Sequence, residues 1–239
     1  MQNDSVQTRR QILIALAAME WNLIKKWAMA GHLPTFRRLL EEGAHGELST
    51  TSAQLPDTIW ASIYTGVNPA KFEKYFYIQY DRETQGLRNV PDDAIRRKPF
   101  WDYLTDAGCK LCEVDVPKFP LSFSITGCHV TNWGAHATKT ARASNPPELL
   151  REIDARFGPH PVGDCDAADT KPEALHRLRR NILDGVARHG ELFRWLTKRY
   201  DWDVFLAGFS APHCIGHHFW HWIDSTHPKH GQQDPLWPR

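Results

Sequence analysis

Val204-Phe-Leu-Ala-Gly-Phe209 is followed, three residues later, by His213-Cys-Ile-Gly-His217. The first segment is a short apolar run, typical of a strand covered on both faces of a parallel sheet. Gln11-Ile-Leu-Ile-Ala-Leu16 and Cys109–Val116 have the same character. Apolar strands that alternate with helical segments predict an α/β fold. Because open α/β sheets bind ligands beyond the carboxyl ends of their strands, the histidines stand where a site is expected.

The rest of the chain agrees with this fold class. Helical spacing or boundary signals indicate several helices, which lie at 20–30, 35–42, 58–64, 146–157 and 172–199. We therefore expect a mostly parallel sheet flanked by helices on both faces, in one domain over residues 1–239. Residues 118–170 are expected to form an irregular or cap-like insert. Because such a domain rarely ends in a long polar loop like 224–239, we expect the sheet to be incomplete at the C-terminus.

Bulk composition excludes some partners. Lys and Arg number 29 against 28 Asp and Glu, for a net charge of +1, so nothing indicates a nucleic-acid polymer or an anionic membrane. The apolar run 12–19 is too short to span a bilayer. Five cysteines without a disulfide-framework spacing indicate a reducing compartment, and we expect the protein to be cytoplasmic.

The histidine spacing is the main chemical signal. His213 and His217 are four residues apart, as are His217 and His221. Residues at this spacing share a helix face, so two imidazoles can reach one metal ion. Packing in the core is the alternative for such a pair. His218 and Trp220 would point elsewhere, into packing.

Thr58 is a second candidate, because it stands where a helix begins. The free N–H groups and the dipole at a helix start favour an anion, and a hydroxyl there can attack phosphorus. The alternative is that Thr58 or Asp57 serves only as the helix N-cap.

Two longer segments resemble a known family. Gly31-His-Leu-Pro-Thr-Phe-Arg-Arg-Leu-Leu-Glu-Glu-Gly43 and Ile59-Trp-Ala-Ser-Ile-Tyr-Thr-Gly-Val-Asn-Pro69 resemble the type I phosphodiesterase/nucleotide pyrophosphatase family of the alkaline phosphatase superfamily. The resemblance implies an alkaline phosphatase-like fold, two zinc ions and a small-molecule phosphate ester as substrate. Carried over by position, it makes Thr58 the nucleophile and makes His213 and His217 ligands of one zinc ion.

The chain also departs from the family pattern. Ala17 stands where the first strand of the family ends in a metal-binding Asp, and Glu20 is one turn too late to replace it. Phe72-Glu73 replaces a His-Gly pair, and the later Asp-His pair and final His have no counterpart. At most one partial zinc site is therefore expected. We expect an impaired phosphate-ester hydrolase; the alternative is a non-catalytic relative that binds a ligand or partner. A sulfatase or phosphonate hydrolase is a weaker third possibility, since the Cys-x-Pro-x-Arg motif of sulfatases is absent.

Overall fold

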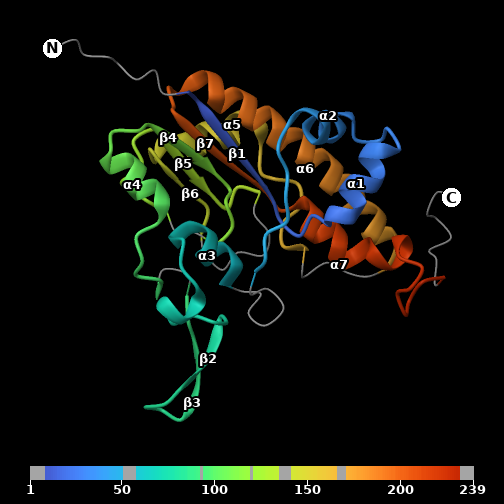
Figure 1. Ribbon diagram of the computed structural model, residues 1–239, viewed down its shortest axis with the longest axis horizontal. Helices are drawn as coiled ribbons and strands as arrows, with labels where there is room; N and C mark the ends of the chain where they lie inside the picture. The colour runs from blue at the N-terminus through green and yellow to red at the C-terminus, as the bar shows by residue number, and fades with distance from the viewer. Residues whose placement is uncertain are drawn as a thin grey trace.

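A five-stranded sheet lies at the centre of the computed structural model, which describes residues 9–50, 58–91, 94–118, 121–134, 141–165 and 171–231 (Figure 1). Its strands, in spatial order, are β1 (Gln11–Leu16), β7 (Val204–Phe209), β4 (Leu111–Val114), β5 (Cys128–Thr131) and β6 (Ala143–Asn145). The first four run parallel to their neighbours, and β6 is antiparallel to β5. The predicted mostly parallel sheet is therefore confirmed.

Helices cover both faces of this sheet. On one face lie α5 (Glu148–Phe157) and α6 (Pro172–Arg199), whose Ile153 and Leu192 pack with Phe205 of β7 in one buried cluster. On the other face lie α3 (Ile59–Thr65) and α4 (Phe100–Asp106), whose Tyr64 and Trp101 pack with Leu206. Phe205 and Leu206 are neighbours in one strand, so they point to opposite faces and join the two clusters.

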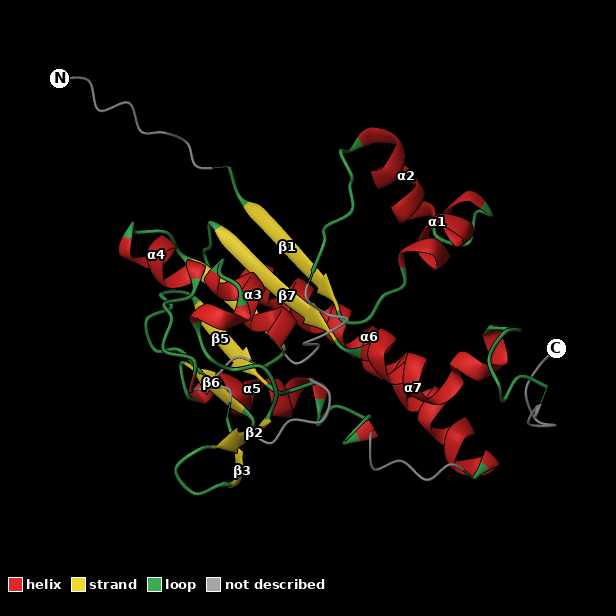
Figure 2. Ribbon diagram, turned by 60° about the horizontal axis from the view of Figure 1, so that its bottom comes forward, coloured by secondary structure: helices red, strands yellow, loops and turns green. Residues whose placement is uncertain are grey.

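Three parts stand apart from these layers. Helices α1 (Trp21–Met29) and α2 (Pro34–Glu42) form a pair beside the sheet, and the hairpin of β2 (Ile78–Asp81) and β3 (Gly86–Asn89) extends away from it (Figure 2). Helix α7 (Ala211–Ile223) follows β7 directly and packs against α6. Among the described residues, no helix has the length and apolar character needed to cross a bilayer.

One expectation about burial is wrong. β1 has its predicted bounds, but it is an outer strand of the sheet, and Ile12, Leu13 and Ile14 are 59%, 51% and 58% exposed. An apolar run indicates that a strand can be covered on both faces, but the strand order decides whether it is. The neighbouring strand β7 has the same apolar character and is buried, because it lies between β1 and β4.

Residues 118–170 are expected from the sequence to form an irregular insert with a helix at 146–157, and their described part contributes two strands besides that helix. They contain β5 and β6, which complete one side of the sheet, and α5, which covers it. The short strand Cys128–Thr131 is fully buried. Its four residues are too few to produce a clear periodic signal, and for this reason the sequence pattern did not reveal it.

Candidate active site

The carboxyl ends of three parallel strands carry unusual backbone conformations. Ala18, Asp115 and Asn132 follow β1, β4 and β5, and their φ angles are 55°, 55° and 60°. This left-handed region costs a residue other than glycine roughly 1–2 kcal/mol. Such conformations concentrate at functional sites. The edge of the sheet where they occur is therefore the place to look for chemistry.

The two predicted zinc ligands meet on α7. His213 and His217 lie one turn apart, and their Nε2 atoms are 2.8 Å from each other. Their rings meet edge to face, with centroids 4.4 Å apart. The helix begins directly after β7, at Ser210, so the pair lies just beyond the carboxyl end of that strand. His218, on another side of the helix, contacts the Cys165 carbonyl oxygen through Nε2 at 2.7 Å, as expected of a packing residue.

The pair fits part of a zinc site. Two imidazoles bound to one tetrahedral zinc ion hold their nitrogens about 3.3 Å apart, so a small rotation from the observed 2.8 Å would suffice. A catalytic zinc ion also needs a third protein ligand. Within the described ranges, no group of three or more His, Cys, Asp or Glu side chains could hold a metal ion. The described residues therefore supply two ligands and no complete site.

Thr58 lies at the start of α3 and is fully buried. It occupies the N-cap position, but its side chain makes no capping hydrogen bond to the helix. The simple capping alternative therefore does not explain this hydroxyl. Asp57, the other capping candidate, lies outside the described residues.

Position 17 offers no metal ligand. The Ala17 N–H donates to the Phe209 carbonyl at 2.9 Å, which places Ala17 beside the last residue of β7. Glu20 is occupied elsewhere: its carboxylate accepts from the Leu23 N–H at 2.7 Å and from the Asn22 side chain at 3.0 Å. These contacts cap α1, as expected for an acid at a helix start.

A buried Asp–His pair at the same edge was not found from the sequence. The Asp115 carboxylate accepts hydrogen bonds from the Trp133 and Gly134 N–H groups, each at 2.8 Å, and lies 2.7 Å from Nε2 of His189. Asp115 and His189 are 1% and 3% exposed. The pair therefore ties β4, the turn after β5 and α6 together. The position of Asp115 after a strand was a usable signal, whereas nothing marked His189 within its helix.

His160 lies against this pair and lines a small cavity. Its ring meets those of Trp133 and His189 at centroid distances of 5.2 and 5.3 Å. Burial, followed by the neighbouring His189, lowers the pKa of His160 from 6.5 to about 4. The cavity is about 20 Å³ and is also lined by Ser210 and Cys214, which gives room for a single water molecule.

Two glycines make room for these rings. A Cβ atom on Gly134 would lie 2.4 Å from the His189 ring and 2.8 Å from the His160 ring. A Cβ atom on Gly185 of α6 would lie 2.6 Å from Nε2 of His160. A side chain at either position would displace a histidine, so the glycines are part of how the sequence builds this edge.

A second buried ion pair lies inside the sheet. His129 of β5 pairs through Nε2 with Glu113 of β4. The Ser122 N–H donates to Nδ1 of His129 at 3.0 Å, so Nε2 carries the proton that faces the carboxylate. Burial raises the pKa of Glu113, and the histidine partly opposes that shift. Both side chains are almost fully buried, and the pair holds two neighbouring strands together.

These features define an α/β protein whose candidate site lies at the carboxyl edge of a mostly parallel sheet. The model of the type I phosphodiesterase / nucleotide pyrophosphatase family matches residues 11–232, so the chain belongs to that family. Its relatives are therefore hydrolases of the phosphodiesterase and pyrophosphatase type.

Solved structures show the same fold. Phosphonoacetate hydrolase from Sinorhizobium meliloti 1021 in complex with phosphonoacetate superposes with a TM-score of 0.50 at 16% identity, over 84% of this chain. The same enzyme in complex with phosphonoformate gives 0.49 and 16% over the same share. The match covers 46% of the hydrolase chain, so this chain spans about half of that length. A search of curated proteins finds no significant match.

Proposed function

We propose that this chain is a hydrolase of small phosphate esters, with Thr58 as nucleophile and with His213 and His217 as ligands of one zinc ion. A bound zinc ion would supply charge stabilisation to the phosphoryl oxygens. The residues of the chain would position the Thr58 hydroxyl for attack on phosphorus and hold the imidazoles toward one another. Family membership supports the reaction class.

One observation carries the metal assignment. The Nε2 atoms of His213 and His217 converge to 2.8 Å immediately beyond β7. A direct hydrogen bond between two neutral imidazoles also gives this distance, so the support for zinc comes from the convergence of the two nitrogens together with their place in the fold. Placement at the carboxyl edge of a parallel sheet gives the pair access to a ligand bound there.

We further propose that turnover is weak or absent. Ala17 leaves the end of β1 without a carboxylate, and the part of the chain that the structure describes adds no third ligand to the two imidazoles, one fewer than a catalytic zinc site needs. A two-metal site stabilises both the attacking and the leaving oxygen, so loss of ligands removes much of the rate enhancement.

Zinc binding tests the metal assignment directly. Calorimetric titration of zinc into the protein should show one weak site, and His213→Ala combined with His217→Ala should remove it. His32→Ala with His45→Ala removes two exposed histidines far along the chain and should leave binding unchanged. If the His213→Ala, His217→Ala variant still binds zinc as the wild type does, the assignment of these two ligands is refuted.

Turnover tests the nucleophile and the impairment separately. With p-nitrophenyl phosphate or bis(p-nitrophenyl) phosphate as substrate and zinc added, we expect p-nitrophenol to be released at a rate near background. Any residual zinc-dependent release should disappear in Thr58→Ala. Rapid release that is lost in Thr58→Ala would show that the chain is not impaired. Release that is unchanged in Thr58→Ala would rule out this residue as nucleophile.

A non-catalytic binding protein is the second candidate. The alanine at position 17 and the two-ligand set favour it, because a protein that only binds a phosphate ester does not need a bimetal clamp. Binding of a non-hydrolysable phosphonate in the presence of zinc, together with background turnover, would support this alternative over the hydrolase.

A further inference from the structure

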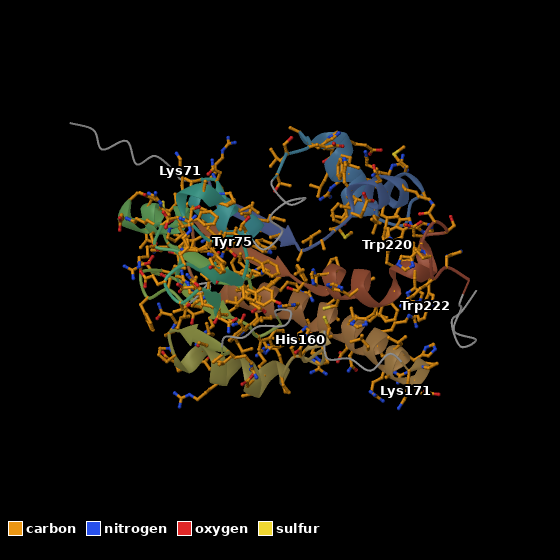
Figure 3. All side chains as sticks on the ribbon, turned by 90° about the horizontal axis from the view of Figure 1, so that it is seen from below. Lys71, Tyr75, His160, Lys171, Trp220 and Trp222 are labelled. Atoms are coloured by element: carbon orange, nitrogen blue, oxygen red, sulfur yellow. The ribbon has the colours of Figure 1, made fainter. Side chains whose placement is uncertain are left out.

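A second hollow lies at the base of the β2–β3 hairpin. Its volume is about 530 Å³. This volume falls within the range of small-molecule pockets, which is about 300–1,000 Å³. In Figure 3, Lys71 and Tyr75 of this region lie on the opposite side of the molecule from Trp220 and Trp222 of α7. The hollow is therefore separate from the His213 and His217 pair.

The charged lining of the hollow is strongly positive. It consists of five cationic side chains and one acid, namely Lys71, Lys74, Arg88, Arg96, Arg97 and Glu73. Five positive charges against one negative charge leave a formal charge of +4. Asp92 and Asp93 lie outside the described residues, and counting both together with Asp81, which pairs with Arg88, would still leave +1. A concave surface with this excess concentrates anions.

Several of these cations are held in place by the protein. The Arg97 side chain donates from Nε and Nη2 to the Lys71 carbonyl oxygen at 3.1 and 3.0 Å. The Arg88 Nε atom lies 3.2 Å from an Asp81 carboxylate oxygen. A guanidinium group has five N–H donors, so each arginine keeps further donors after these contacts. Lys74 is only 2% exposed, so its ammonium group is confined.

We propose that this hollow binds a small polyanion that carries two or more phosphate or carboxylate groups. Arginine side chains form paired, charge-assisted hydrogen bonds with both kinds of group. The exposed cations Lys71, Arg88, Arg96 and Arg97 come from three segments of the chain and are more than one oxyanion can contact. The binding needs neither zinc nor turnover, and it is independent of the proposed hydrolysis.

Calorimetry with two probes tests the proposal. Inorganic tripolyphosphate represents phosphate ligands and citrate represents carboxylate ligands, each titrated at low salt into protein freed of metal ions by passage over a chelating resin. We expect micromolar binding of at least one probe, with the tighter probe identifying the oxyanion, and weaker binding as sodium chloride is raised. Lys71→Gln with Arg96→Gln should weaken this binding at least tenfold. Both side chains are exposed, so the variant should keep its melting temperature.

A matched variant removes the same charge elsewhere. Arg194→Gln with Lys198→Gln lowers the net charge equally on the exposed side of α6 and should bind the probes as the wild type does. His213→Ala with His217→Ala should also retain binding, which separates this site from the proposed zinc site. Failure of the wild type to bind either probe, or equal loss in the α6 variant, would overturn the proposal.

Discussion

At the scale of the residue, the carboxyl edge of the sheet buries His189 fully and His160 in part. The buried His189 ring has a hydrogen-bond partner, because its Nε2 lies 2.7 Å from the Asp115 carboxylate. His160 packs against the same ring, and burial together with the neighbouring His189 favours its neutral form. Neutral imidazoles are the form that binds metals and accepts protons, but burial of this degree also makes them sensitive to acid.

His160 should make folding dependent on pH. Its pKa is about 4 in the folded protein, below the reference value of 6.5, so the unfolded chain binds more protons between these values. The free energy of unfolding should fall as pH drops from 6.5 toward 4, by about 1–3 kcal/mol from this residue. Urea unfolding at several pH values measures the effect, and His160→Gln should reduce the slope.

His45→Gln is the control, because His45 is exposed and lies far from the site in sequence. Its unfolding should follow the wild-type pH profile. The assignment to His160 fails if His160→Gln and the wild type lose the same free energy over this range.

At the scale of the element, β1 is an outer strand of the sheet whose apolar side chains are largely exposed. It pairs on one side with β7, and three consecutive apolar side chains are more than half exposed. An outer strand with unpaired backbone groups and apolar side chains promotes association with other strands. Ile12 and Ile14 point to one face and Leu13 to the other, so neither face of the strand is protected.

Lysines on β1 should reduce self-association. We expect Ile12→Lys with Ile14→Lys to lower aggregation on concentration, since charge on an outer strand opposes edge-to-edge pairing. Stability should change by no more than about 0.5 kcal/mol, as for other exposed positions. Light scattering and sedimentation measure the association.

Leu48→Lys provides the comparison, because Leu48 is 95% exposed but lies outside the sheet. It should aggregate as the wild type does. Equal improvement in both variants would mean that general surface hydrophobicity, and not the strand, causes association.

At the scale of the whole molecule, burial is unevenly distributed. The clusters above and below the sheet contain the central strands and the helices α3 to α6. A further cluster joins the start of α6 to α7. By contrast, α2 buries no side chain, and its nine residues are too few for a stable isolated helix.

Hydrogen exchange should follow this distribution. We expect the amides of α2 to exchange through local opening at a small fraction of the global unfolding free energy, and those of β4, β5 and β7 to require near-global unfolding. Helix α5 is the matched control: it has ten residues but buries Leu149 and Ile153, so it should exchange slowly. Equal protection of α2 and α5 would contradict this view.

Local patterns predicted much of the fold. The apolar runs at 11–16 and 204–209 are strands in the structure, the run at 109–116 contains the shorter strand Leu111–Val114, and His213 and His217 share a helix face as their spacing predicts. The exposure of β1 was missed, because burial depends on which strands lie on either side. The contact between Asp115 and His189 was also missed, because it joins residues 74 positions apart. Pairing over such distances leaves no periodic signal in a single sequence.

The length of α6 has a mechanical consequence. Its 28 residues span about 42 Å. Its first half packs with α7 through Leu178 and Ile182, and its second half packs with the sheet through Leu192 and Leu196. The helix is therefore packed on the sheet at one end and on α7 at the other, so a slight tilt at Leu192 becomes a larger translation where α6 contacts α7. Repacking of the core would in this way displace His213 and His217 relative to the strands without touching either residue.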